Sequence, residues 1–313
     1  MSWSRNRGLS GRLLKLVALA VAAWFVVKSP AFAAGKRVLV TGAGGRTGRI
    51  ILEKLVASGR YDVRALVTSQ GSKAALLKRV PMLPESSVFV GDIVTKESLV
   101  DAFAGVVMVV VATSAVPKPK LWSLVTLLVG KLFGRKGKLR FSWKGGKPEQ
   151  VDWEGQRNQF DLAKQVGAKK VVVVGTMTGT QEDSFLNSIG EGDGDKIVMW
   201  KRKAEVYLID LCKSGDMSYT LVHAGGLSDK EGGKEPISVG VDDTLLNATP
   251  RRRIPRADVA EVCVQALECD KAKNRSFDLG STEDGKPLKA EGLGELLDTL
   301  EGKNCDYTIN PPP

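Results

Sequence analysis

The sequence predicts an α/β protein built on one doubly wound parallel sheet. Apolar, β-branched runs that suit strands alternate with amphipathic helical patterns from residue 36 to about residue 280. One run, Val106 to Val111, is apolar throughout, which is typical of a parallel strand buried on both faces. A glycine-rich turn between the first strand and the first helix completes the pattern.

The elements follow in a simple order. Strands are expected at residues 38–40, 61–67, 87–90, 106–111, 169–174, 219–222 and 276–279, and helices at 50–56, from 95, at 151–166, 197–211 and 257–267. The chain therefore divides into a leader (1–35), a main domain (36–285) with an insert at 117–147, and a small C-terminal region with a helix and tail (286–313) on the substrate side.

The stretch KRVLVTGAGGRTG at 36–48 places Gly42, Gly45 and Gly48 three residues apart, between strand and helix. Glycine permits positive φ and close backbone approach, and the start of a helix presents free N–H groups to an anion. This pattern predicts that the turn binds the diphosphate of a dinucleotide. The alternative is a glycine loop that only reverses the chain.

The end of the second strand bears on which nucleotide binds. Thr68 stands where an acidic residue would bind both ribose hydroxyls of NAD, and the cations Arg46, Arg64 and Lys73 are expected nearby. The absence of an acid favours a 2′-phosphate, so NADP is the expected cofactor and NAD the alternative.

The net charge of +11 is concentrated in two segments. Residues 1–33 carry +5 and residues 117–147 carry +9, so the rest of the chain is slightly acidic. This distribution argues against a nucleic-acid-binding face. The four cysteines show no paired short spacing, so no metal site or disulfide framework is expected.

The leader has the three parts of a secretory signal. Residues 1–12 are basic and polar, 16–27 are uncharged and apolar, and small residues allow cleavage after Ala31 or Ala33. The apolar run is short for a membrane span, which needs about 20 residues, although an uncleaved signal anchor is an alternative. Residues 29–33 also resemble the cleavage motif of proteins sent to plastids with extra membranes, so entry to the secretory pathway or to a plastid is expected.

The insert at 117–147 combines an apolar helical pattern at 121–133 with a basic segment that contains Phe141 and Trp143. This composition fits a peripheral contact with a membrane surface. Two alternatives stay open: a helix packed over the sheet with a solvated basic loop, and an apolar lid over a substrate site.

Several motifs together resemble one family. The segments TGAGGRTG, ATSAVPK, PEQVDWEGQRNQ, VVVVGTM, WKRKAE, HAGGL and PRADVAEVC occur in this order. They resemble the atypical short-chain dehydrogenases/reductases of the NmrA-like NAD(P)-binding group, most closely its small plant members, whose reaction is unsettled. The resemblance covers residues 36 to 285 except much of 121–145, and it implies a Rossmann fold.

The resemblance also implies a cofactor site. Its residues are Thr41, Gly42, Gly44, Gly45, Arg46, Thr47 and Gly48 at the phosphates, Asp92 at the adenine, Thr113 and Ser114 along the ribose, and Lys201 and Gly225 at the nicotinamide end. Two positions depart from relatives that often have arginine: Thr68, which weakens the expectation of NADP, and His223, the only histidine, which becomes a candidate pocket residue.

Catalytic members of this superfamily use a tyrosine four residues before the lysine as proton donor. No tyrosine here has that spacing, and Ile197 stands four residues before Lys201. The remaining candidate catalytic groups are Lys201, Thr176 and His223. Two functions stay open: an NADPH-dependent oxidoreductase of unknown small-molecule substrate, and a non-catalytic NADP(H)-binding redox-sensing or scaffold module acting through a partner or membrane. An epimerase is disfavoured because it needs the same tyrosine.

Overall fold

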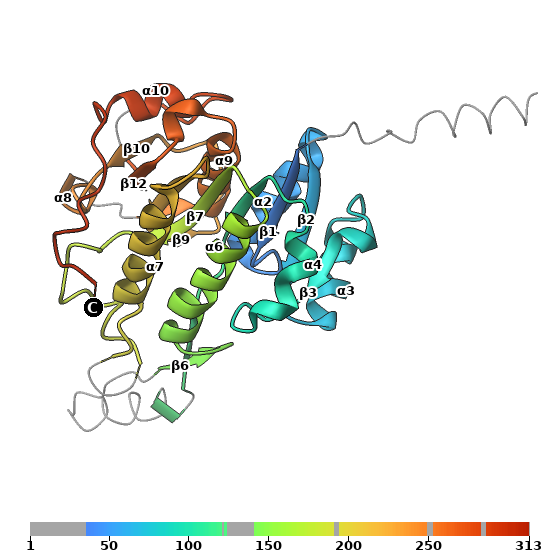
Figure 1. Ribbon diagram of the computed structural model, residues 1–313. Helices are drawn as coiled ribbons and strands as arrows, with labels where there is room; N and C mark the ends of the chain where they lie inside the picture. Colours follow the sequence, from blue (N-terminus) through green and yellow to red (C-terminus); the bar gives the residue numbers. More distant parts are fainter. Residues whose placement is uncertain are drawn as a thin grey trace, which may run out of the picture. The chain divides into compact units, whose positions relative to one another are not determined.

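An eight-stranded sheet forms the centre of the computed structural model (Figure 1). Its strands are β1 (Arg37–Thr41), β2 (Asp62–Val67), β3 (Val88–Val90), β4 (Met108–Val111), β7 (Lys170–Thr176), β8 (Ser218–Ala224), β10 (Ile237–Gly240) and β12 (Arg275–Ser281). They lie in the order β10-β12-β8-β7-β4-β1-β2-β3. The predicted doubly wound parallel sheet is thus confirmed, with one addition: β10, which the sequence analysis did not predict, runs antiparallel to β12 at the edge.

The structure describes residues 36–120, 122–123, 141–190, 194–248, 253–282 and 286–312, all within one unit that spans Lys36–Pro313. The predicted leader lies outside these residues. Among the residues described, no helix combines the length and the apolar character needed to cross a bilayer.

Helices cover both faces of the sheet. They are α2 (Arg46–Ser58), α3 (Gln70–Arg79), α4 (Val100–Phe103), α6 (Gly155–Gln165), α7 (Ile197–Cys212), α8 (Leu245–Ala248), α9 (Arg256–Ala266) and α10 (Leu293–Asp298), with a π-helical turn at Glu149–Glu154 before α6. Helices α6 and α7 lie side by side across one face (Figure 1). The apolar core accordingly has two parts: one contains Phe103 and Phe160 from α4 and α6, and the other contains Ile51 and Val262 from α2 and α9.

Two small sheets lie outside the central one. Strands β5 (Val116–Pro119) and β6 (Phe141–Lys144) pair antiparallel, and β9 (Gly226–Ser228) and β11 (Arg253–Pro255) pair parallel. β5 and β6 form the two ends of the insert, whose residues 121 and 124–140 lie outside the described residues. The predicted contact of segment 121–147 with a membrane therefore stays a prediction.

Lys170, the first residue of β7, is a buried cation that makes stability depend on pH. Its ammonium donates to the carbonyl of Ala272 at 3.0 Å, and its residue is 4% exposed. Burial lowers the pKa of Lys170 to about 7. Below that pH the amine is charged in the folded and the unfolded state, so folding carries the full free-energy cost of burying the charge. Between about 7 and 10.5 the unfolded chain holds a proton that the folded chain has lost, so stability rises with pH.

We expect Lys170→Met to be more stable than the parent protein at about pH 6, because no charge is then buried. Its advantage should shrink by about 1.4 kcal/mol per pH unit above the folded pKa. Chemical denaturation between about pH 6 and 9 measures this difference. Lys169→Met is the matched control, since Lys169 is 60% exposed and pairs with Asp216 at the surface. A pH-independent difference for Lys170→Met would contradict the expectation.

Candidate cofactor and substrate site

Two glycines of the turn after β1 make backbone contacts that leave no room for a side chain. Gly42 has φ +67°, and a Cβ there would lie 2.6 Å from the carbonyl oxygen of Ala112. A Cβ on Gly48 would lie 2.3 Å from the carbonyl oxygen of Gly42. These two glycines therefore hold the first turn of α2 against the ends of β1 and β4.

The N-terminus of α2 is left open for an anion. Its N-cap, Gly45, has extended backbone angles and forms no side-chain hydrogen bond to the helix, and the first turn contains no acid. Gly44, Gly45 and Arg46 are exposed. The first amides of a helix have no partner within it and carry its positive dipole end. The turn can thus bind a phosphate, as its sequence predicts.

A cavity of about 590 Å³ lies beside this helix start. The strand order reverses at β1, between β2 and β4, which is where ligands bind in doubly wound sheets. The cavity brings together six of the predicted site residues: Arg46, Thr47, Ser114, Thr176, Lys201 and Gly225. Most of the remaining wall is apolar and includes Pro117, Trp143, Leu186, Ile189, Ile197, Leu227 and Leu246.

The other predicted cofactor residues lie outside this lining. Thr41, Gly42, Gly44, Gly45 and Gly48 form the turn beside the cavity or the strand end that leads into it.

Two further predicted residues follow the carboxyl ends of strands. Thr113 follows β4, and its hydroxyl accepts a hydrogen bond from Gln159 Nε2 at 3.2 Å. Asp92 follows β3, is exposed, and accepts from the amide of Val94 at 3.0 Å. Both therefore lie at the same edge of the sheet as the turn, although neither lines the cavity.

Lys201 is held in the cavity wall by Asp152, a residue to which the sequence analysis gave no role. The ammonium lies 2.7 Å from Asp152 Oδ1, and the two side chains are 8% and 0% exposed. The amide of Ala115 donates to the other carboxylate oxygen at 3.1 Å. Burial raises the pKa of Asp152, while the Lys201 ammonium acts in the opposite direction. The ion pair therefore fixes the direction of the lysine side chain.

Asp152 lies in the π-helical turn Glu149–Glu154, where a wider backbone spiral replaces the regular helix. Such turns are frequent at functional sites. The segment VDWEGQ, which contains Asp152, belongs to one of the motifs that carry the family resemblance, so the sequence marked this region as functional. It could not show that Asp152 pairs with Lys201, because 49 residues separate them.

Ile197 occupies the position of the missing tyrosine. It is the first residue of α7, one turn before Lys201, and both line the cavity. An apolar side chain therefore stands where the superfamily's proton donor would be. Thr176 ends β7 and also lines the cavity, so its hydroxyl is available there.

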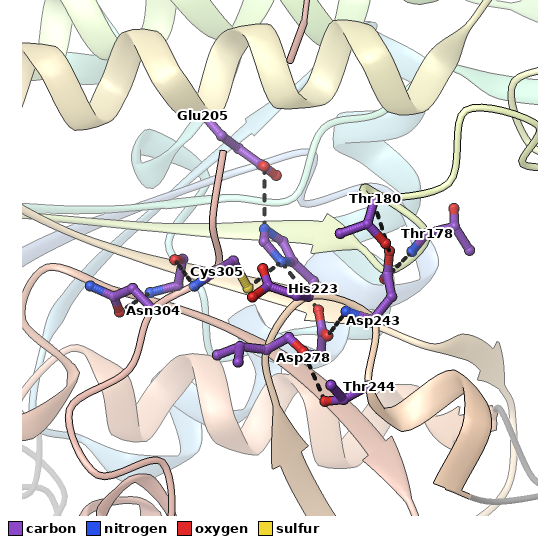
Figure 2. Close-up of polar contacts among 12 residues, drawn as sticks. Thr178, Thr180, Glu205, His223, Asp243, Thr244, Asp278, Asn304 and Cys305 are labelled. Carbon is purple, nitrogen blue, oxygen red and sulfur yellow. Dashed lines mark hydrogen bonds and ion pairs between the residues drawn. The ribbon is translucent and has the colours of Figure 1, made fainter. Parts of the chain in front are cut away.

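The structure places His223 away from the cavity lining. The residue is 5% exposed, and its ring lies between Glu205 on α7 and Asp278 on β12 (Figure 2). Nε2 is 3.2 Å from Glu205 Oε2 and 3.3 Å from the Tyr307 hydroxyl. Both ring nitrogens thus face protein groups, and we assign His223 no part in proton transfer to a substrate.

The region expected to bind a 2′-phosphate is the start of α3. Ser69 caps this helix by accepting from the amide of Ser72 at 3.1 Å, and a Cβ on Gly44 would lie 3.7 Å from Ser72 Cβ. The start of α3 therefore borders the glycine turn, and its first turn contains no acid. Lys73 lies in this turn and is 3.7 Å from Glu85.

The predicted position of Arg64 near the 2′-phosphate is wrong. Its guanidinium donates to the carbonyls of Asp101, Ala102 and Ala104 and lies over the ring of Phe89. These contacts hold the side chain against the segment around α4, so Arg64 has a structural role.

A second arginine near the glycine turn was not identified from the sequence. Arg256, at the start of α9, lines the cavity, and its Nη1 is 2.6 Å from Asp229. Arg46 approaches the same carboxylate at 3.5 Å. Asp229 is 69% exposed, so the shared carboxylate lies at the solvent side of the two cations. Two arginines therefore stand near the helix N-terminus, where phosphates would bind.

The fold and the site define a dinucleotide-binding protein with a Rossmann sheet. Residues 42–270, well over half of the chain, match the family described as NAD(P)H-binding. The chain belongs to this family, and within it to the NmrA-like, atypical short-chain dehydrogenases/reductases, as its motifs predict.

Two relatives and one solved structure illustrate the similarity. The chain is 46% identical over 268 residues to the chloroplastic Arabidopsis thaliana protein At2g37660, described as uncharacterized, covering 85% of this chain and 76% of that one. It is 41% identical over 269 residues to sanguinarine reductase from Eschscholzia californica, covering 82% and 91%. Gre2 from Candida albicans, solved in complex with NADPH, has a TM-score of 0.53 at 16% identity, with 86% and 85% covered. That identity shows the fold alone.

Gly45 offers a test of phosphate binding that separates binding from folding. Gly45 already has N-cap backbone angles and aspartate is a favoured N-cap, but a Cβ there would lie 3.0 Å from the carbonyl oxygen of Gly42, so Gly45→Asp should change the free energy of unfolding by less than about 1 kcal/mol. The same carboxylate would repel a diphosphate. We therefore expect NADPH binding, measured by calorimetry, to weaken at least about 100-fold, a cost of about 2.7 kcal/mol.

Gly45→Asn is the matched control, because asparagine has the same size without the charge and should retain most of the binding. Equal affinity for NADPH in the parent protein and in Gly45→Asp would show that phosphates do not bind at the start of α2.

Proposed function

We propose that this protein is an NADPH-dependent oxidoreductase that reduces a small apolar or conjugated substrate in the 590 Å³ cavity. The observation that carries the proposal is the lysine in the wall of that cavity. Lys201 is fixed by a buried carboxylate beside an open helix N-terminus, an arrangement that a chain-reversing loop alone would not need. The relative named as a reductase supports the same class of activity.

Each part of the site has a role in this proposal. The amides at the start of α2, with Arg46 and Arg256, bind the diphosphate. Lys201 holds the nicotinamide ribose and orients it, because Asp152 fixes the direction of its side chain. NADPH, when bound, supplies the hydride. Thr176 donates a hydrogen bond to the substrate group that receives negative charge.

The composition of the cavity supports the substrate class. Its wall combines Trp143, Leu186 and Leu227 with few polar groups, which suits an apolar or aromatic molecule with one polar end. Because Ile197 cannot donate a proton, a substrate that needs no strong acid near the hydride acceptor fits best. Pro117 and Trp143 belong to the two ends of the insert and line the cavity, which supports a contact of these ends with the substrate.

We expect enzymatic turnover to depend on Lys201. With NADPH and a panel of quinones, enals, conjugated ketones and aromatic iminium ions, one class should give loss of absorbance at about 340 nm. Lys201→Ala should reduce kcat about 100-fold, within the usual range for a positioned catalytic group. Asp152→Asn should reduce kcat less, because its single amide oxygen can still accept from the lysine although the charge and the hydrogen bond from the Ala115 amide are lost.

Lys203→Ala is the matched control, since Lys203 is on the same helix and lies over the rings of Trp153 and Trp200. Turnover that persists unchanged in Lys201→Ala would contradict the assigned role.

We infer a preference for NADP from the start of α3. Ser69, Ser72 and Lys73 lie at an N-terminus without acids, beside the glycine turn. A 2′-phosphate would be stabilised there by the helix dipole and the lysine.

Thr68→Asp should reverse the preference. A carboxylate at the end of β2 would accept hydrogen bonds from both ribose hydroxyls of NADH and repel the 2′-phosphate of NADPH. We expect the ratio of the two dissociation constants, measured by calorimetry, to shift at least about 10-fold towards NADH. Thr68→Asn serves as the uncharged control, and an unchanged ratio in Thr68→Asp would contradict the placement of the 2′-phosphate.

A second function, a non-catalytic NADP(H) sensor, is favoured by Ile197 alone. The site would then bind nucleotide and change the lining loops without chemistry. In that case the parent protein and the Gly45→Asn control bind NADPH with the same affinity. Neither of them then reduces any member of the substrate panel.

We propose a plastid as the site of action. The relative from Arabidopsis is named as chloroplastic, and residues 29–33 fit the cleavage motif of a bipartite plastid leader. A fluorescent fusion of the first 35 residues tests the proposal, since retention in the secretory pathway would contradict it.

A further inference from the structure

Three potential metal ligands converge beneath the floor of the cavity. His223 on β8 and Asp278 on β12 are paired residues of neighbouring parallel strands, and Cys305 reaches them from the C-terminal tail (Figure 2). All three residues are buried, and the ring nitrogen, a carboxylate oxygen and the sulfur lie within 4.8 Å of one another. The cluster borders Gly175 of the cavity lining, where a Cβ would lie 2.8 Å from His223 Cδ2.

Two of the three separations in the cluster match those of ligands that share one ion. His223 Nδ1 is 3.4 Å from Asp278 Oδ1 and 3.5 Å from Cys305 Sγ. The first distance is about 0.4 Å longer than a good N–H···O bond, and one nitrogen carries only one proton for two acceptors. Zinc bonds of about 2.0–2.3 Å at tetrahedral angles place ligand atoms about 3.3–3.7 Å apart.

The surrounding contacts have the form of an outer shell around a metal site. The other ring nitrogen, Nε2, faces Glu205 Oε2 at 3.2 Å, as metal-bound histidines usually face a carboxylate. The second oxygen of Asp278 accepts from the amide of Asp243 at 2.7 Å. The amide of Cys305 donates to Ser276 Oγ at 3.0 Å. These contacts orient the three ligands through Nε2, Oδ2 and the backbone amide. The atoms that would bind the metal, Nδ1, Oδ1 and Sγ, are not used in them.

The charges of the cluster are compatible with a bound cation. The side chains of Glu205 and Asp278 are 3% and 2% exposed and pair with one imidazole, and Glu205 also accepts from the Tyr307 hydroxyl at 3.1 Å. Buried carboxylates are costly unless they are paired with positive charge. A divalent cation bound by the Cys305 thiolate and the Asp278 carboxylate would neutralise these two ligands, and Glu205 would face the outer ring nitrogen of His223.

We propose that His223, Asp278 and Cys305 bind a zinc ion that fastens the C-terminal tail to the sheet. Mixed nitrogen, oxygen and sulfur ligands at this spacing select zinc among the common divalent ions. The tail also bonds to the loop beside the cavity, because Asn310 Nδ2 donates to the carbonyl of Gly179 at 3.2 Å. The absence of paired cysteines in the sequence does not conflict with this site, since each ligand comes from a different segment.

The test uses the full-length protein, which is purified in the presence of a chelator. The chelator is then removed, and the protein is titrated with metal ions. Calorimetry should show one Zn²⁺ per chain with micromolar or tighter affinity, and Co²⁺ should give a thiolate charge-transfer band in the near ultraviolet. Cys305→Ser should abolish the band. Glu205→Gln, which removes a partner of His223 but no ligand, should weaken Zn²⁺ binding roughly 10- to 100-fold. Cys305→Ser and His223→Gln each remove a ligand and should weaken it more.

Cys269→Ser is the control thiol and should bind Zn²⁺ like the parent protein. If a ligand variant does not fold, the parent protein decides: Zn²⁺ should raise its melting temperature, and a chelator should reverse the increase. No Zn²⁺ binding by the parent protein, or equal affinity in folded Cys305→Ser, would overturn the proposal.

Discussion

The site depends on one steric constraint, the contact of backbone with backbone at the glycine turn. Gly48 lies against the carbonyl of Gly42, and Gly42 lies against the carbonyl of Ala112. Because neither approach admits a Cβ, α2 begins directly at the ends of β1 and β4. The unpaired amides of its first turn thereby face the crevice where the strand order reverses. Arg46 and Thr47 reach the cavity for the same reason.

Helix α7 places two buried charged groups one turn apart on the same face. Lys201 pairs with Asp152 in the cavity wall, and Glu205 pairs with His223 beneath the cavity floor. Buried ion pairs seldom add net stability, since desolvation offsets their attraction. Their presence is better explained by the fixed side-chain directions that they provide. One pair orients a group towards the cavity, and the other supports the floor through Gly175.

Much of the fold could be predicted because its signals are local. The central strands are continuous apolar runs, and burial on both faces is what such runs encode; Val109 and Val172, for example, are fully buried. The glycine spacing likewise reports a local backbone requirement. Lys201 could be placed only through the family motif, and the structure does bring it to the cavity.

The remaining features depend on contacts between distant segments, which no local pattern contains. Asp152 meets Lys201 across 49 residues, and Arg64 bonds to carbonyls 37 to 40 residues away. Strand β10 was missed because Ile237–Gly240 is short and gains its place only by pairing with β12. His223 stood at a strand end near the expected pocket, but the pleat points its ring to the face that the tail covers.

The C-terminal tail illustrates how distant contacts reach the site. Its prolines suggest only an end to regular structure, yet Tyr307 donates to Glu205 at 3.1 Å and Arg202 donates to two tail carbonyls. Asp278, beside the tail, accepts from the amide of Asp243, and Asp243 in turn accepts from the amide of Thr178 in the cavity lining (Figure 2).

A continuous set of polar contacts therefore joins the last residues of the chain to the loop that follows β7. Since buried polar contacts of this kind hold their groups in one arrangement, the shape of the cavity is set by the C-terminal residues as well as by the nucleotide-binding half of the sheet.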